Sequence, residues 1–193
     1  MEQESLRISW RQLPNAITLL RIFLVAPIVF CLAREWYRDA LWLFLVAGLS
    51  DGLDGFLART FHWASRFGAI TDPLADKVLL VSVFVVLTIN GLLPLWLTIL
   101  VFARDLIIVA GALTYHMLVG SYSIRPSVWG KLSTFAQITY VLVVVLYYAG
   151  LPMPLLAVEQ GVWIVAATSL ISGAHYVTVW GRKYWLERSG TTT

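Results

Sequence analysis

The sequence is poor in charged residues, which make up 13% of its 193 positions, whereas apolar residues make up 59%. A soluble domain of this size carries roughly twice that charged fraction. The shortage excludes an ordinary soluble domain and predicts an integral membrane protein. The net charge of +3 does not indicate nucleic-acid binding, because membrane proteins carry Lys and Arg that set their orientation. We therefore expect no nucleic-acid partner.

Cysteine and histidine are also scarce. The single cysteine, Cys31, excludes an internal disulfide and zinc sites of the Cys₄ or Cys₂His₂ type. The three histidines, His62, His116 and His175, are not at metal-ligand spacing from one another, so packing or interfacial roles are expected. A secretory signal peptide is not indicated either, because two glutamates precede any apolar run and no clear small-residue cleavage site follows.

Long apolar runs, by contrast, are abundant. A membrane-spanning helix needs about 20 mostly apolar residues. Six runs approach or exceed this length, at 15–33, 40–60, 69–90, 94–118, 129–150 and 156–179. They predict an all-α integral membrane protein with six transmembrane helices in a single domain, 1–193.

The distribution of Lys and Arg predicts the orientation of these helices. Nine of these residues fall on the side shared by both termini and two on the opposite side, so both termini are expected in the cytoplasm. Residues 1–14 would form a cytoplasmic or interfacial segment, and residues 180–193 a cytoplasmic tail.

Four aspartates stand out against this apolar background. Asp51 and Asp54 lie late in the second run, and Asp72 and Asp76 lie early in the third. Residues three or four apart share a helix face, so each pair forms a stripe on its own helix. A polar turn at 60–67 allows the two helices to face each other and the four carboxylates to converge. Buried carboxylates that repel one another need cations among them, and oxygen ligands suit Mg²⁺ or Mn²⁺.

The residues beside the aspartates strengthen this interpretation. Gly55, Ala58 and Gly68 leave room for a ligand or for close helix contact. Arg59 and Arg66 stand where they can meet phosphate groups. Four carboxylates can hold two metal ions as a clamp around a phosphoryl group. A carboxylate-lined ion or proton transporter is the alternative that these residues leave open.

The spacing of these residues resembles the complete signature of the CDP-alcohol phosphatidyltransferases, Asp51-x2-Asp54-Gly55-x2-Ala58-Arg59-x8-Gly68-x3-Asp72-x3-Asp76. The resemblance implies that an alcohol displaces CMP from a CDP-linked lipid, usually CDP-diacylglycerol. It implies that the four aspartates bind two divalent cations, Mg²⁺ or Mn²⁺, and that Asp76 is also the general base. The glycines, the alanine and Arg59 of the signature would border the nucleotide. A catalytically inactive lipid-binding homologue is a third possibility, against which the intact aspartates argue.

A second stretch, "LPNAITLLRI" at 13–22, is similar to the opening of the first helix in this family. The resemblance implies that Asn15, Thr18 and Arg21 help to bind the nucleotide or shape the cavity. Asn15 has an alternative role as a helix cap after Pro14. Arg21 lies inside a predicted span, where a charged partner is expected.

The acceptor alcohol would be bound by basic residues if it is phosphorylated. The candidates are Arg104, Arg125 and Lys131. Arg104 and Asp105 are adjacent, so we expect them to point to different sides of a helix and Arg104 to pair with another anion. Alternatively, Arg104 is a partner in a buried structural network, and Lys131 an anchor on the cytoplasmic side.

The stretch "GKLSTFAQ" at 130–137 is similar to the branch of the family that uses glycerol-type acceptors. That branch includes phosphatidylglycerophosphate synthases, which use glycerol-3-phosphate, and cardiolipin synthases, which use phosphatidylglycerol. The stretches at 102–105 and 175–183 favour the second group, while inositol phosphate and serine are alternative acceptors. The resemblance further implies a homodimer in the bacterial cytoplasmic membrane, with its active site facing the cytoplasm.

Overall fold

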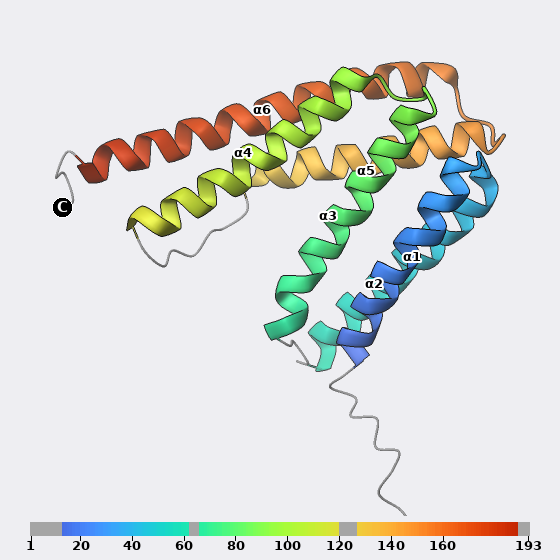
Figure 1. Ribbon diagram of the computed structural model, residues 1–193, viewed down its shortest axis with the longest axis horizontal. Helices are drawn as coiled ribbons and strands as arrows, with labels where there is room; N and C mark the ends of the chain where they lie inside the picture. The colour runs from blue at the N-terminus through green and yellow to red at the C-terminus, as the bar shows by residue number, and fades with distance from the viewer. Residues whose placement is uncertain (1–12, 62–65, 120–126, 189–193) are drawn as a thin grey trace, which may run out of the picture. The chain divides into compact units, whose positions relative to one another are not determined.

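The computed structural model describes the backbone of residues 13–61, 66–119 and 127–188, and within them the side chains of residues 23–50, 76–111 and 127–179. The described residues form six helices and no strand, which confirms the all-helical prediction (Figure 1). The helices are α1 (Leu13–Ala33), α2 (Tyr37–Phe61), α3 (Arg66–Ile89), α4 (Leu95–Val119), α5 (Val128–Tyr148) and α6 (Leu155–Arg188). Each corresponds to one predicted span to within a few residues, but α6 continues through much of the segment predicted as a tail.

The helices group into two compact units. The first contains α1, α2 and α3 together with Tyr148–Gly150, and the second contains α4, α5 up to Tyr147, and α6. In the first unit α1 packs against both α2 and α3, and in the second α4 packs against α6. The single domain expected for the whole chain stays a prediction.

Each unit has an apolar core built from helix faces. In the first unit Ile28 and Leu32 lie one turn apart on α1 and are fully buried, as are Phe84 and Leu87 on α3. Spacings of three and four residues place such side chains on one face of a helix. The corresponding core residues of the second unit are Leu97, Val101, Val144, Val145 and Val165.

Residues 148–150 belong to the first unit because two contacts anchor them there. The Arg38 side chain donates a hydrogen bond from Nε to the carbonyl oxygen of Ala149 at 2.9 Å. The rings of Tyr37 and Tyr148 lie 5.6 Å apart between centroids. Burial raises the pKa of the Tyr37 hydroxyl above its ordinary value. The turn between α1 and α2 is thereby tied to the end of α5.

The end of α1 has a backbone conformation that is unusual for its residue. Glu35 has a φ of 62°. Its N–H bonds to the carbonyl of Leu32 at 3.0 Å, and the N–H of Trp36 bonds to the carbonyl of Cys31 at 2.8 Å. This is the pair of bonds that closes many helices, with glycine normally at the left-handed position. After α5 that position is held by Gly150, with a φ of 80°.

We expect Glu35→Gly to raise the free energy of unfolding by about 0.5–1 kcal/mol. The left-handed conformation costs a non-glycine residue about 1–2 kcal/mol, and the greater freedom of glycine in the unfolded chain offsets part of the gain. Thermal unfolding in detergent micelles measures the change. The control is Ala33→Gly, at a helical position of the same turn, which should destabilise by about 0.5–1 kcal/mol. Shifts of the same sign in both variants would contradict the strain at Glu35.

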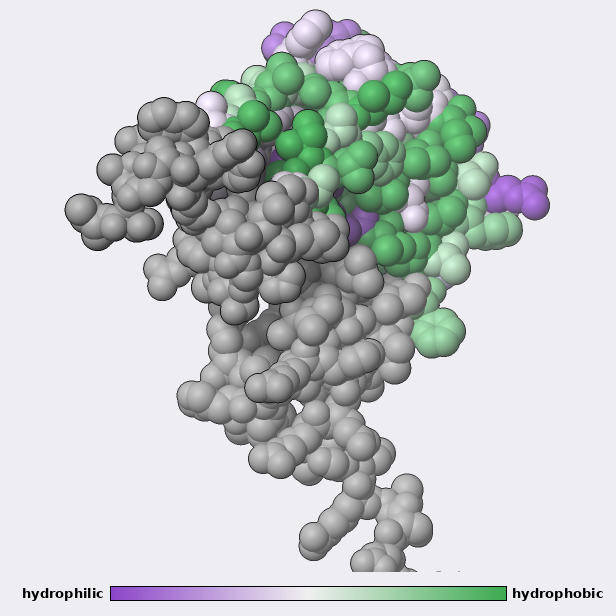
Figure 2. All heavy atoms as spheres, turned by 60° about the vertical axis from the view of Figure 1, so that its left-hand side comes forward, coloured by the Kyte–Doolittle hydropathy of each residue, from purple (hydrophilic) through white to green (hydrophobic). Residues whose placement is uncertain are grey.

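The outer surface of the helices is strongly apolar, as the green areas of Figure 2 show for the residues drawn in colour. Large apolar side chains are well exposed on all six helices, among them Phe23, Leu49, Ile89, Leu106, Phe135 and Trp163. Soluble monomers rarely expose contiguous apolar surface on this scale. The surface is that of a protein whose helices face lipid.

Two helices are long and apolar enough to cross a membrane within the part of the chain whose side chains are described, at Val128–Tyr148 and Leu155–Val179. The described part of α1, Phe23–Ala33, is apolar but shorter. In α1 to α4 some of the side chains lie outside the described ranges. Six spans and cytoplasmic termini therefore stay predictions.

Candidate active site

The backbone places the four aspartates on two helices of the first unit. Asp51 and Asp54 are three residues apart in α2, and Asp72 and Asp76 are four residues apart in α3. Each pair thus has the helical spacing that puts two residues on one face. The side chain of Asp76 is described and is exposed, whereas the other three lie outside the described side chains. Convergence of the four carboxylates stays a prediction.

A divalent metal site fits this donor set chemically. Four carboxylates and no softer ligand are the chemistry that Mg²⁺ and Mn²⁺ prefer. Among the residues with described side chains, no group of three or more His, Cys, Asp or Glu is placed to hold a metal ion. Because three of the four predicted ligands lie outside that set, this observation leaves the predicted site untested.

The residues expected at the nucleotide also lie on the first unit. Gly55, Ala58 and Arg59 are in α2, Gly68 is in α3, and Asn15, Thr18 and Arg21 are in α1. Because α1 packs against both α2 and α3, the structure brings together the helices that carry these residues and the aspartates. The side chains of all seven residues lie outside the described ranges, so their roles stay predictions.

The alternative role of Asn15 as a helix cap is wrong. Helix α1 already begins at Leu13, so Asn15 lies within the first helical turn and not at the capping position. Pro14 is compatible with this start, because the first turn of a helix needs no N–H donor from it.

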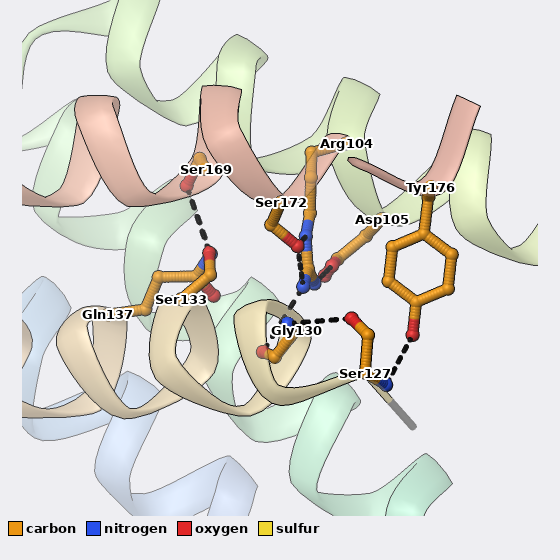
Figure 3. A network of polar contacts seen from close by, with 9 residues as sticks. All are labelled: Arg104, Asp105, Ser127, Gly130, Ser133, Gln137, Ser169, Ser172 and Tyr176. Carbon is orange, nitrogen blue, oxygen red and sulfur yellow. Dashed lines mark hydrogen bonds and ion pairs between the residues drawn. The ribbon is translucent and has the colours of Figure 1, made fainter. Parts of the chain in front are cut away.

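Arg104, on α4, lies at the centre of a buried polar network in the second unit (Figure 3). Its side chain is only 5% exposed. Nε and Nη2 both donate hydrogen bonds to Oγ of Ser172, on α6, at 3.1 and 2.7 Å. Nη2 also donates to the carbonyl oxygen of Gly130, on α5, at 3.2 Å. One guanidinium group therefore connects three helices.

The prediction that Arg104 and Asp105 are poor partners is wrong. Nη1 of Arg104 lies 2.6 Å from Oδ1 of Asp105 and forms an ion pair with it. Adjacent residues do point their Cβ atoms in different directions, but the arginine side chain is long enough to turn back to its neighbour. The alternative that Arg104 is a buried network partner is confirmed, while a contact with the acceptor stays a prediction.

The same network fixes the first turn of α5. Ser127 precedes the helix, and its Oγ accepts the N–H of Gly130 at 3.0 Å, as a capping serine does. The N–H of Ser127 in turn donates to the hydroxyl oxygen of Tyr176, on α6, at 3.2 Å. A Cβ on Gly130 would lie 3.3 Å from each of three polar atoms, on Arg104, Ser127 and Tyr176. The lack of a side chain at Gly130 lets these groups meet.

The other two acceptor candidates are close to this turn along the chain. Lys131 follows Gly130 directly and is exposed. Arg125 lies two positions before Ser127 in the sequence but outside the described residues. The structure thus brings Arg104 to the turn that carries Lys131, and it does not place Arg125.

Sequence reasoning missed the hydroxyl groups of this network and those of a second buried polar cluster on α5 and α6. Nε2 of Gln137 lies 3.3 Å from Oγ of Ser133 and 3.4 Å from Oγ of Ser169, and all three residues are fully buried. The available signal was the spacing of three and four residues between polar positions of apolar helices, as in Ser169, Ser172 and Tyr176. Polar groups at such positions hydrogen-bond across helices in membranes.

The chain belongs to the CDP-alcohol phosphatidyltransferase family, whose model matches residues 11–180. This match confirms the family that the spacing of the aspartates indicates. It covers both units described above and extends over all six helices. Members of this family are enzymes that are bound to membranes.

Three curated relatives have names that belong to the two groups of the glycerol-acceptor branch. The chain is 37% identical over 174 residues to a probable phosphatidylglycerophosphate synthase of Mycobacterium tuberculosis, covering 86% of this chain and 79% of that protein. It is 29% identical over 183 residues to the CDP-diacylglycerol–glycerol-3-phosphate 3-phosphatidyltransferase of Bacillus subtilis, covering 85% and 92%. It is 31% identical over 182 residues to a cardiolipin synthase (CMP-forming) of Streptomyces coelicolor, covering 90% and 77%.

Proposed function

We propose that the protein transfers the phosphatidyl group of CDP-diacylglycerol to the hydroxyl of a glycerol-type acceptor and releases CMP. The observation that carries the proposal is the family match over residues 11–180, within which all four aspartates of the signature lie on two helices of one unit. The names of the relatives support glycerol-3-phosphate or phosphatidylglycerol as the acceptor.

The aspartates would hold two divalent cations, Mg²⁺ or Mn²⁺, which when bound neutralise the diphosphate and the charge that develops during transfer. Asp76 acts as the general base and takes the proton of the acceptor hydroxyl. The hydroxyl oxygen then forms a bond to the phosphorus that carries the diacylglycerol, and the bond from this phosphorus to the CMP oxygen breaks. Asp51, Asp54 and Asp72 serve as ligands only.

The residues assigned to the donor and the acceptor candidates lie on different helices. Helices α1, α2 and α3 carry the residues assigned to the donor and the metals. Helices α4 and α5 and the segment before α5 carry the acceptor candidates Arg104, Lys131 and Arg125. Variants in the second unit should therefore change the KM of the acceptor more than that of CDP-diacylglycerol.

Membrane placement follows from the same proposal. Six spans with cytoplasmic termini put the aspartates near the cytoplasmic surface, where CMP, a water-soluble product, can leave. The donor is itself a lipid and reaches the site from the bilayer. We assign the protein to a bacterial cytoplasmic membrane, as a homodimer, in keeping with the charge distribution and the bacterial relatives.

Purified protein is expected to release CMP from CDP-diacylglycerol when Mg²⁺ or Mn²⁺ and one glycerol-type acceptor are present. The assay compares glycerol-3-phosphate, phosphatidylglycerol, inositol phosphate and serine, and mass spectrometry identifies the lipid product. Controls omit the acceptor or replace the metal with EDTA. If only serine or only inositol phosphate yields CMP, the proposal of a glycerol-type acceptor is wrong. If none of the acceptors yields CMP with either metal, the transferase function fails and the transporter becomes the better explanation.

A further inference from the structure

One face of α6 carries two hydroxyl groups that hold parts of other helices. Ser172 accepts two N–H groups of Arg104, which comes from α4. Tyr176, four residues later and so about one turn along the same face, accepts the backbone N–H of Ser127 at the start of α5. The labelled side chains in Figure 3 point toward one another from these three helices. Because these hydroxyl residues carry no charge, the search for basic residues that bind the acceptor alcohol does not select them.

The contacts of Arg104 fix the orientation of its guanidinium plane. Asp105 compensates the charge through Nη1, and the Gly130 carbonyl takes one bond from Nη2. Ser172 alone contacts both Nε and Nη2, so it holds the edge of the plane opposite to Asp105. Without this hydroxyl the ion pair with Asp105 and the bond to the Gly130 carbonyl remain, so the arginine stays buried, but Nε loses its partner and the plane is held less firmly. Ser172 therefore sets the direction of the guanidinium and not its charge.

Tyr176 acts on the other side of the same turn. Its hydroxyl oxygen holds the N–H of Ser127, whose side chain caps α5 at Gly130. Gly130 is also the residue whose carbonyl Arg104 contacts. Hence α6 determines both where the guanidinium lies and where the backbone next to Lys131 lies.

We propose that Ser172 and Tyr176 are positioning residues for the acceptor alcohol, acting through Arg104 and the first turn of α5. This inference rests on the proposed function, because it assigns the acceptor to that region. Neither hydroxyl needs to touch a substrate. Their effect is to preset the polar groups of α4 and α5, so that binding the acceptor requires little rearrangement.

The decisive comparison is between two serines of the same helix. Ser172→Ala removes the hydroxyl that holds Arg104, whereas Ser169→Ala removes an equally buried hydroxyl that contacts Ser133 and Gln137. We expect Ser172→Ala to raise the KM of the acceptor by about tenfold, and by no more than about a hundredfold, the limit set by the free energy of one hydrogen bond to a charged group. The KM of CDP-diacylglycerol should stay within about twofold. Ser169→Ala should leave the ratio of the two KM values unchanged.

Two further variants separate positioning from packing. Ser172→Thr keeps a hydroxyl at the same place and should restore most of the acceptor KM. Tyr176→Phe keeps the ring and loses only the hydroxyl, so its acceptor KM should rise by about twofold to tenfold, as for a neutral hydrogen bond. Thermal unfolding of each purified variant reports whether the fold is intact.

The measurements are steady-state kinetics in detergent micelles, with glycerol-3-phosphate and phosphatidylglycerol as acceptors and each substrate varied in turn. If the wild-type protein releases no CMP, the proposed function is wrong, and the positioning role of Ser172 and Tyr176 is then wrong as well. An active wild type in which Ser172→Ala changes both KM values equally, or matches Ser169→Ala, would overturn the inference alone. So would failure of Ser172→Thr to restore the acceptor KM in a variant that unfolds at the wild-type temperature.

Discussion

The variant Asp76→Asn is expected to lose turnover by a factor of about 10²–10⁴, the usual contribution of a general base. An amide has nearly the same size and shape as a carboxylate, but it cannot accept the proton of the acceptor hydroxyl. Three of the four proposed metal ligands remain, so much of the binding of CDP-diacylglycerol should remain as well.

The measurement pairs CMP release with equilibrium binding of CDP-diacylglycerol in the presence of Mn²⁺. Asp39→Asn is the matched control, because Asp39 lies in the first turn of α2 and is an exposed aspartate outside the proposed site. It should turn over at the wild-type rate. Near-normal turnover in Asp76→Asn would refute the assignment as base. If turnover and donor binding fall by the same factor, Asp76 is a metal ligand and not the general base.

The helices could be predicted because few backbone conformations are stable in a membrane. Backbone groups in lipid must be satisfied within a helix, so each apolar run of about 20 residues becomes one helix. The predicted runs match the six helices closely, except that α6 continues to Arg188. An apolar run ends where charges begin, at Arg182 and Lys183, but Lys and Arg favour helices about as well as leucine does. The hydropathy of the sequence therefore predicts where an apolar run ends, but it does not predict where the helix itself ends.

The aspartates and the network around Arg104 differ in how far the sequence points to them. Asp51, Asp54, Asp72 and Asp76 are selected as candidates by their spacing, because charge in an apolar helix is costly and rarely accidental, and their role stays a prediction. The network around Arg104 was not predictable in the same way. A serine such as Ser172 costs little in an apolar helix, so its presence predicts no particular contact. The pairing of Arg104 with Asp105 depends on a side-chain rotamer, which sequence spacing does not determine.

The close contact between α5 and α6 gives the largest expected effect on stability. Gly161, on α6, lies against the ring of Tyr140, on α5, which is buried. A Cβ on Gly161 would lie 2.6 Å from Cε2 of that ring and closer still to Cδ2, a distance that real side chains do not adopt. We expect Gly161→Ala to lower the free energy of unfolding by about 1–3 kcal/mol, the usual cost of overpacking a buried contact. Small residues at helix contacts in membranes permit such close approach.

The control and the rescue use residues of the same two helices. A Cβ on Gly173, also on α6, would lie 3.8 Å from Cγ of Arg104, an ordinary van der Waals distance, so Gly173→Ala should be neutral or stabilise by up to about 1 kcal/mol. Tyr140→Leu should relieve the clash, so the double variant with Gly161→Ala should be more stable than the two single effects added together. Thermal unfolding in micelles, measured for the wild type, both single variants and the double variant, gives the interaction free energy between the two positions. Simple additivity would mean that the ring of Tyr140 is not what Gly161 accommodates. Coupling would instead show that Gly161 accommodates the ring of Tyr140, a contact between the same two helices that the bond from Ser127 to Tyr176 joins.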